Sequence, residues 1–237
     1  MRTLFALLFA STIFLVVMIS PASRQIPAIQ NSSSAGIPIV LRSLVRSSGV
    51  IVLPIFTQAA YGQDGFYKFY SGRCDMRCLT VPIPKNFTAS YVTGGGLDDV
   101  LLKQGLATVT DLDIDKDPSI LDKYDKVILL HNEYVTHKEF DAITHHPNVI
   151  YLYPNALYAQ VKVDYDKNTI TLVRGHEYPQ KDIRNGFGWA FDDSKYEYNT
   201  VCKDWQFYEV KNGYMLDCYP QLVIEDDNHM LEKMMLL

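Results

Sequence analysis

The sequence predicts an α/β fold in which a parallel sheet with helices on its faces is followed by antiparallel hairpins at the C-terminal end. Short apolar runs alternate with helical patterns between residues 49 and 153, as in parallel sheets that are covered by helices. After Pro154 the apolar residues recur at every second position, which is typical of antiparallel strands. The chain has 237 residues, of which 48% are hydrophobic, so it can form a globular domain with its own core.

The parallel part is outlined by apolar runs and by residues that start or stop helices. Gly105 follows a helical pattern and is a typical helix stop. Thr136 and Glu139 form a capping box, which predicts a helix that ends near His146. The predicted strands are 49–55, 79–83, 106–110, 126–130 and 149–153, the predicted helical segments are 97–104, 118–124 and 137–146, and a tyrosine-rich loop covers 58–72.

Two hairpins are predicted in the C-terminal third. The first pairs residues 156–163 with residues 169–173. The second pairs 205–211 with 214–219 around Asn212-Gly213, a dipeptide that favours a two-residue type I′ turn.

The register of the second hairpin bears on the four cysteines. With Asn212-Gly213 as the turn, Cys202 and Cys218 are offset by roughly 16 Å along the strands, whereas a disulfide needs Cα atoms within about 7 Å. We therefore expect Cys202 or Cys218 to bond to the loop that holds Cys74 and Cys78. A bond between Cys202 and Cys218 requires the strand to end near Lys203 and the chain to double back.

The N-terminus has the pattern of an export signal. Arg2 precedes an apolar run from Leu4 to Ile19, and small residues follow up to Ala22, where we expect cleavage. Uncleaved, the same segment would be a membrane anchor, and it is the sequence's only indication of membrane contact. Residues 1–22 are thus interpreted as a signal peptide, 23–47 as a tether, and 48–237 as a single domain.

Two further features agree with a secreted or otherwise extracytoplasmic protein. Asn31 and Asn86 begin N-glycosylation sequons, and the four cysteines are an even number that disulfides could use up. The formal net charge is -5 and no Lys/Arg cluster exceeds a pair, which argues against nucleic acid as a partner.

The strongest candidate site lies where the strand at 126–130 runs into His131-Asn132-Glu133-Tyr134. Ligands of open α/β sheets bind beyond the carboxyl ends of the strands. His131 and Glu133 are two residues apart, so an extended backbone directs both side chains the same way. The pair can bind a metal or share a proton transfer, or it can be a hydrogen bond that orders the loop.

Several segments in order resemble a known family. They are Leu106–Asp115, Ile120–Asp125, His131–Thr136, Asn155–Tyr158 and Thr171–Val173. Together they resemble the C-terminal domain of the N,N-dimethylformamidase large-subunit family, in which a strand ends in His-Asp-Glu-Tyr-Trp and an Asn-x-x-Tyr motif follows. The resemblance implies a glutamine-amidotransferase-like fold with a flavodoxin-like parallel sheet. This chain has Asn132 and Val135 where the family has Asp and Trp.

The resemblance also implies a chemistry. Characterised members hydrolyse small amides with a mononuclear iron held by two tyrosines and the Glu of the His-x-Glu motif. Carried over, Glu133 is the iron ligand and His131 a catalytic or supporting group. Tyr61 is the first candidate for a tyrosine ligand, because Gln58 to Gly62 resembles the family's Gln-Ala-Tyr-Asn segment with one residue inserted. For the second tyrosine, the candidates are Tyr67, Tyr70 and Tyr91.

Other patterns are weighed against plain structural roles. Cys74 and Cys78 lack the strand-to-helix elbow of a catalytic cysteine, so disulfides are the better interpretation. The glycines at 94–96 lack a phosphate-binding motif and predict a turn. His176-Glu177 follows a strand and could complete a site.

Two functions remain open from the sequence. The first is a metal-dependent hydrolase of a small linear amide, with iron as the cofactor, Glu133 and Tyr61 as ligands, and His131 and Glu133 in the reaction. The second is a non-catalytic extracytoplasmic domain for binding or cell-surface structure that keeps the scaffold. In the first case we expect His131 and Glu133 to converge with Tyr61 or another upstream tyrosine in one cleft.

Overall fold

The computed structural model describes residues 49–90, 92–103, 105–220 and 228–237, all of which belong to one compact unit, Ile39–Leu237. The predicted signal peptide with its cleavage after Ala22, the tether, the sequon at Asn31 and the candidate ligand Tyr91 lie outside the described residues. Within the described part, no helix is long and apolar enough to cross a membrane.

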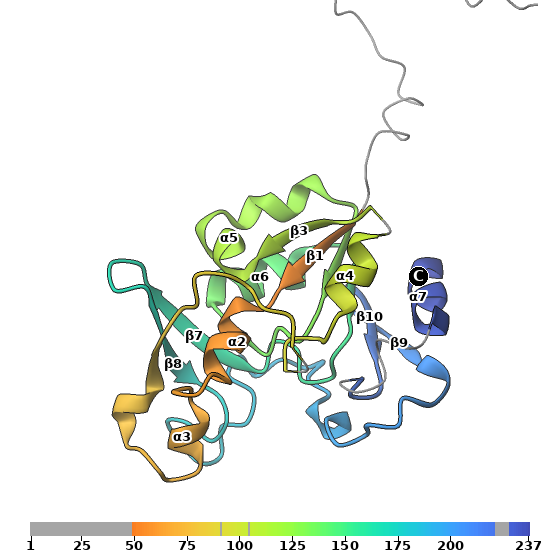
Figure 1. Ribbon diagram of the computed structural model, residues 1–237. Helices are drawn as coiled ribbons and strands as arrows, with labels where there is room; N and C mark the ends of the chain where they lie inside the picture. Colours follow the sequence, from red (N-terminus) through yellow and green to blue (C-terminus); the bar gives the residue numbers. More distant parts are fainter. Residues whose placement is uncertain (1–48, 91, 104, 221–227) are drawn as a thin grey trace, which may run out of the picture. The chain divides into compact units, whose positions relative to one another are not determined.

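The central feature is a six-stranded sheet with the order β3-β1-β4-β6-β10-β9 (Figure 1). Neighbouring strands are parallel from β3 to β10, and β9 is antiparallel to β10 at the edge. Counted along the chain, the parallel strands follow the order 2-1-3-4-5, which is the flavodoxin-like order. The predicted fold class is confirmed. The strands are β1 (Gly49–Leu53), β3 (Ala107–Thr110), β4 (Lys126–Leu129), β6 (Val149–Tyr151), β9 (Phe207–Val210) and β10 (Gly213–Leu216).

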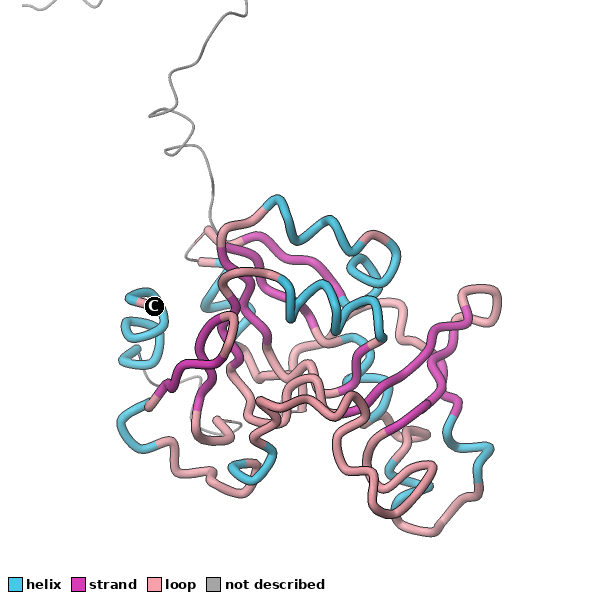
Figure 2. Tube along the Cα trace, turned by 180° about the vertical axis from the view of Figure 1, so that it is seen from behind, coloured by secondary structure: helices cyan, strands magenta, loops and turns pink. Residues whose placement is uncertain are grey.

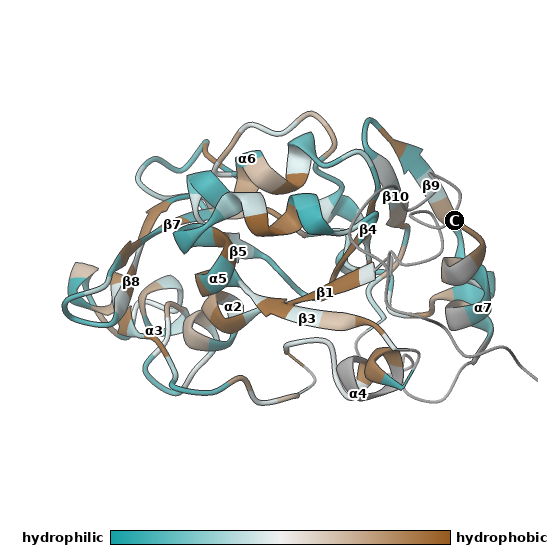
Figure 3. Ribbon diagram, turned by 90° about the horizontal axis from the view of Figure 1, so that it is seen from above, coloured by the Kyte–Doolittle hydropathy of each residue, from teal (hydrophilic) through white to brown (hydrophobic). Residues whose placement is uncertain are grey.

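Helices cover both faces of this sheet, because its central strands are continuous apolar runs that have to be buried on both faces (Figure 3). On one face Val52 packs in a core cluster with Ile114 of α5 (Asp111–Lys116) and Ile143 of α6 (His137–His145). On the other face Ile51 packs with Leu101 of α4 (Leu97–Leu102), in a cluster that also includes α7 (Asn228–Leu236).

A second sheet, with the order β2-β8-β7-β5, holds the first predicted hairpin (Figure 2). β7 (Ala159–Asp164) and β8 (Thr169–Arg174) are antiparallel, as predicted, and β2 (Thr80–Pro82) extends the sheet beside β8. β5 (Tyr134–Val135) lies parallel to β7, so the segment after β4 leaves the main sheet and joins the second one. The residues next to the candidate site therefore bridge the two sheets.

The sequence interpretation missed the helix after β1. Residues to 55 were expected to be strand and residues from 58 to be loop, but β1 ends at Leu53 and α2 spans Ile55–Ala60. The reason is tertiary: Pro54 offers no side-chain cap, and the Asp111 carboxylate accepts the Phe56 backbone N–H at 2.8 Å from across the domain. The remaining short helices are α3 (Tyr67–Tyr70), η1 (Met76–Leu79), η2 (Pro118–Lys123), η3 (Ser194–Tyr196) and η4 (Lys203–Trp205).

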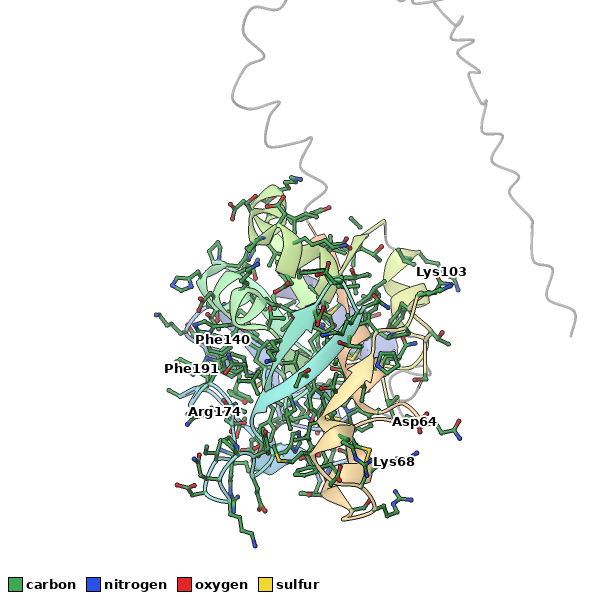
Figure 4. All side chains as sticks on the ribbon, turned by 90° about the vertical axis from the view of Figure 1, so that its left-hand side faces the viewer. Asp64, Lys68, Lys103, Phe140, Arg174 and Phe191 are labelled. Atoms are coloured by element: carbon green, nitrogen blue, oxygen red, sulfur yellow. A yellow bond between two sulfur atoms is a disulfide. The ribbon has the colours of Figure 1, made fainter. Side chains whose placement is uncertain are left out.

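The loop after β8 packs on α6 through an aromatic cluster. The Phe140 and Phe187 rings stack with their centroids 4.1 Å apart, and Trp189 meets Phe140 edge to face at 6.2 Å. Trp189 also lies 6.1 Å from Phe191, centroid to centroid; Figure 4 labels Phe140 and Phe191 on this side of the molecule. These contacts hold the long connection between β8 and β9 against the domain.

The turn of the C-terminal hairpin differs by one position from the prediction. Gly213 pairs with Val210, so the turn residues are Lys211 and Asn212. The Asn212 side chain also caps α6, because its amide Nδ2 donates to the carbonyl oxygens of Ile143 and His146 at the end of that helix. Gly213 serves the sheet, since a Cβ there would lie 1.8 Å from the Val149 carbonyl oxygen.

The expected disulfide between the C-terminal cysteines and the 74/78 loop is wrong. Cys74 bonds to Cys78, and Cys202 bonds to Cys218, with Cα–Cα distances of 6.0 and 5.1 Å. The predicted strand was too long: β9 begins at Phe207, and the backbone before it has positive φ at Cys202 (44°) and Asp204 (63°). The chain therefore doubles back before the strand, which brings Cys202 to Cys218.

The Gly213 position gives a direct test of the sheet. Gly213→Ala places a methyl group against the Val149 backbone, which cannot move without breaking the β6–β10 pairing. We expect the free energy of unfolding to fall by more than about 2 kcal/mol in urea titrations. The control is Gly188→Ala, where a Cβ meets nothing within 4 Å and only the positive φ opposes alanine. Equal losses in the two variants would contradict the close approach.

Candidate functional site

The candidate site lies beyond the carboxyl ends of β1 and β4, where the strand order of the sheet reverses. Two segments form its base: the loop 131–133 that follows β4, and α2 with its C-terminal residue Tyr61. Loops that follow β6 and β8 supply further side chains. Residues from four parts of the chain thus meet at the switch point of the sheet.

Glu133 is the centre of the site and is fully buried. Its Oε2 accepts a hydrogen bond from the Tyr61 hydroxyl at 2.8 Å and lies 3.3 Å from Nε2 of His131. Its Oε1 lies 2.5 Å from Nε2 of His176. Both carboxylate oxygens are therefore contacted by polar groups of the protein.

The charge of Glu133 is maintained by these neighbours. Burial by itself raises the pKa of a carboxyl group, but the hydrogen bonds and charges of His131 and His176 outweigh it and lower the pKa of Glu133 to about 2. The site therefore holds a buried carboxylate at neutral pH, and the two histidines stabilise its negative charge.

His131 is fixed on every side. Its Nδ1 lies 2.6 Å from the Val92 carbonyl oxygen, which can only accept, so Nδ1 carries a proton. Its Nε2 lies 3.1 Å from Nδ2 of Asn155 and 3.3 Å from the Tyr219 hydroxyl. The imidazole also stacks on the Tyr153 ring at 4.6 Å. His131 is therefore fully buried next to Glu133 and has no contact with solvent.

His176 is the more accessible histidine. Its side chain is 20% exposed, and its ring stacks on Tyr134 and meets Tyr158 edge to face at 4.7 Å. His176 and Glu177 both have positive φ, a strained conformation for residues with side chains, and backbone hydrogen bonds from both to the segment 183–184 stabilise it.

Phenol groups surround the carboxylate. The Tyr67 hydroxyl donates to the Tyr61 hydroxyl at 3.0 Å, so two phenol oxygens follow one another from Glu133 outward. Burial raises the pKa of Tyr61 and of Tyr67, and the negative charge of Glu133 raises both further. Tyr70 lies one step away, with its hydroxyl 3.3 Å from that of Tyr134. Of the two candidates among the described residues, Tyr67 and Tyr70, Tyr67 hydrogen-bonds Tyr61.

Two side chains, Thr57 and Asp111, join helix α2 to the loop after β4. The Thr57 hydroxyl accepts the backbone N–H groups of Glu133 and Tyr134 at 3.0 and 3.2 Å. Asp111 accepts from Asn132 Nδ2 at 2.7 Å and from the Phe56 N–H at 2.8 Å. These bonds set the position of Tyr61 relative to Glu133.

Asn132 occupies the position at which the family that this sequence resembles has Asp. Asn132 points away from Glu133 toward Asp111, which is fully buried. An amide donates to that carboxylate, whereas a second carboxylate would repel it. Val135, the other departure, is buried in the core that includes α6. Both residues therefore belong to the structure that supports the site rather than to the surroundings of the Glu133 carboxylate.

A second buried carboxyl, Glu139 of α6, faces Asp111. Burial raises the pKa of Glu139 well above its usual range, and the nearby Asp111 raises it further; burial likewise raises the pKa of Asp111 to about 6. Among the described residues, neither oxygen of Glu139 has a hydrogen-bond partner. Burial and the nearby charge of Asp111 favour a protonated Glu139, so we expect the pair to share one proton.

A cavity of about 610 Å³ opens beside the site. Tyr67, Tyr70 and His176, which surround Glu133, form part of its wall, together with Tyr158 of the Asn-x-x-Tyr segment. Its rim is charged and is formed by Glu177, Lys181, Arg184 and Glu197. A small molecule in this cavity would touch His176 and the Tyr67 hydroxyl.

The structure brings together His131, Glu133 and Tyr61, as the sequence led us to expect, and adds His176 and Asn155. Their chemical roles stay predictions. The sequence analysis missed Tyr219, Asp111 and Glu139, since no local pattern links these positions to the loop after β4. The glycines at 94–96 form a turn, and Gly94 packs against Leu130, where a Cβ would lie 3.3 Å away.

The donor atoms can be compared with the iron that the family resemblance implies. Within the described residues, no three His, Cys, Asp or Glu side chains are grouped so as to hold a metal ion, so such a site has to draw on tyrosines. Glu133 and Tyr61 have oxygens 2.8 Å apart and Tyr67 follows at 3.0 Å. A carboxylate and two phenol oxygens are hard donors that suit ferric iron, and a cation there would displace the Tyr61 proton. The residues fit the group.

The Thr57 bridge can be tested through stability. Thr57→Val removes the acceptor of two buried backbone N–H groups while keeping the shape of the side chain. We expect a loss of about 2–4 kcal/mol in the free energy of unfolding. Thr57→Ser keeps the hydroxyl and should lose less than half as much. If both variants were equally destabilised, lost packing rather than the hydrogen bonds would be the cause.

The Asp111–Glu139 pair predicts a pH dependence. Because both pKa values are higher in the folded protein than in an unfolded chain, the folded state binds the shared proton more tightly. The free energy of unfolding therefore falls as pH rises from the ordinary carboxyl range through the raised pKa values. Glu139→Gln keeps a donor toward Asp111 without a proton to lose.

We expect Glu139→Gln to flatten this pH dependence and to be on the order of 1 kcal/mol more stable than the wild type at about pH 8. Urea titrations between about pH 5 and 8 measure it. Asp122→Asn, at an exposed position, is the control and should leave the profile unchanged. A Glu139→Gln profile that matches the wild type would show that no proton is shared.

Comparison with known proteins adds no further constraint, since the sequence matches no family model and no curated protein.

Proposed function

We propose that this protein is an exported, metal-dependent hydrolase of small amides, with its active site at Glu133. One observation carries the proposal: a fully buried carboxylate, ionised at neutral pH, faces two consecutive tyrosine hydroxyls beside a cavity large enough for a small substrate. The resemblance to the N,N-dimethylformamidase large-subunit family supplies the reaction type. Buried, paired titratable groups next to a cavity are typical of active sites.

The residues that would hold the ion are Glu133, Tyr61 and Tyr67. When bound, a ferric ion supplies a Lewis acid for the amide carbonyl and for water. Asp111 and Thr57 keep α2 and the loop after β4 in the spacing that brings the Tyr61 hydroxyl to Glu133. The protein's contribution is thus a set of oxygen donors beside the cavity.

The two histidines have different parts in this proposal. His176 faces the cavity with its Nε2 against the Glu133 carboxylate, so its other ring nitrogen, Nδ1, would take a proton from the attacking water and give one to the leaving nitrogen. The water oxygen bonds to the carbonyl carbon, the C–N bond breaks, and the products are a carboxylic acid and an amine. His131, closed off behind Glu133, orients that carboxylate.

Export is part of the proposal. Two disulfides fit an extracytoplasmic protein, because such bonds persist in oxidising compartments. Asn86 is exposed, as a glycosylation site has to be. The N-terminal apolar run supplies the signal.

A non-catalytic binding domain is the second candidate. It is favoured by the fact that Tyr61 and His176 already hydrogen-bond both oxygens of Glu133. A network that is satisfied in this way can be a purely structural element of a binding cavity.

Metal analysis separates the two candidates. The mature protein, incubated with ferric iron and desalted, should retain about one iron per chain and show a tyrosinate-to-iron absorption band in the visible range. Glu133→Gln and Tyr61→Phe should each lower the retained iron at least about tenfold. Tyr214→Phe, on β10, is the matched control and should retain the wild-type amount.

Hydrolysis of formamide and butyramide by the iron-loaded protein, measured as ammonia release, tests the reaction itself. His176→Gln should lower kcat by about two orders of magnitude and leave the iron content unchanged. A protein that binds no iron, or an activity that survives Glu133→Gln, would support the non-catalytic candidate instead.

A further inference from the structure

The rim of the cavity beside Glu133 carries charges that the protein itself leaves unpaired. Arg184 and Lys181 line it, and no carboxylate within the described residues forms an ion pair with either of them. Both side chains are exposed, as expected for groups at an opening. Exposed cationic side chains that form no ion pair within the protein can bind a negatively charged ligand.

Arg184 is held close to the reacting groups by the backbone. The His176 N–H donates to the Arg184 carbonyl oxygen at 2.9 Å, and the Glu177 N–H donates to the Ile183 carbonyl oxygen at 2.7 Å. These two bonds join the segments 176–177 and 183–184 side by side. The start of the Arg184 side chain is therefore fixed at short range from the histidine that contacts Glu133.

The Arg184 side chain also reaches the cavity wall. Tyr158 lies in that wall, with its ring 4.7 Å from His176. Burial and the charges of Asp192 and Glu197 raise the pKa of Tyr158 to about 12, and the positive charge of Arg184 acts against this rise. Arg184 thus lies near enough to this wall residue to act on its charge.

We propose that the substrate is a small amide that also carries a carboxylate, which Arg184 binds at the rim while the amide group lies against His176, next to Glu133. The proposal rests on the function proposed above and names its substrate class. A guanidinium forms two parallel hydrogen bonds with a carboxylate, a geometry that a lysine cannot match. Lys181 supplies a second positive charge at the same opening.

The rim also carries two acidic residues, Glu197 and Glu177. Glu197 is half-buried, and burial and the nearby charge of Glu133 raise its pKa. Glu177 is exposed. The choice of a negatively charged substrate group rests on Arg184 and Lys181, which line the same opening and form no ion pair within the described residues.

The experiment uses three four-carbon amides that differ in the group, and hence the charge, at the far end. Succinamate is negative, butyramide is neutral and 4-aminobutanamide is positive. Binding to the mature protein is measured by isothermal titration calorimetry, with and without iron, and hydrolysis by ammonia release. We expect succinamate to bind at least about tenfold more tightly than butyramide, the amount that a charge-assisted contact supplies.

Arg184→Gln should remove this preference, so that succinamate binds no more tightly than butyramide. Arg77→Gln, at an exposed arginine paired with Asp75 away from the cavity lining, is the matched control and should keep the preference. Equal binding of succinamate and butyramide, a preference for 4-aminobutanamide, absence of succinamate binding, or a preference that survives Arg184→Gln would each overturn the inference.

The two proposals fail in different ways. Arginine-dependent binding of succinamate without hydrolysis would contradict the amidase and leave the carboxylate site standing. Equal hydrolysis of all three amides would establish the amidase and refute the carboxylate site.

Discussion

The bridge between α2 and the loop after β4 is the constraint on which the site depends. Thr57 accepts two backbone N–H groups of that loop, and Asp111 joins Asn132 to the first turn of α2. The same contacts give α2 its missing N-terminal cap and bring Tyr61, at its other end, to Glu133. A short helix that is weak by itself is thus stabilised by the groups it positions.

The fold buries several carboxyl groups around this bridge and accommodates them in two different ways. Glu133 is buried but keeps its charge, because two histidines and a tyrosine contact it. Asp111 and Glu139 are buried next to each other, and burial raises the pKa of both, so we expect them to share a proton. The Glu133 carboxylate thus keeps its charge, whereas the Asp111–Glu139 pair supports the structure.

The second sheet explains how residues far apart in sequence reach one cavity. β5 carries Tyr134 from the main sheet to β7, and the turn after β8 returns His176 to Glu133. This places His176, Tyr158 and Arg184 on one wall. The proposed chemistry and the proposed selectivity consequently lie on the same segment, 175–184.

The sequence by itself determined the parallel sheet, the first hairpin and the His131-x-Glu133 pair at the end of β4, because these follow from apolar periodicity and from the geometry of strand ends. Only the tertiary structure decided α2, since its cap comes from Asp111, and the disulfides, since the chain reverses before β9. It also decided that Gly213 serves the sheet rather than the turn. Each depends on a contact between residues distant in sequence, which no local pattern encodes.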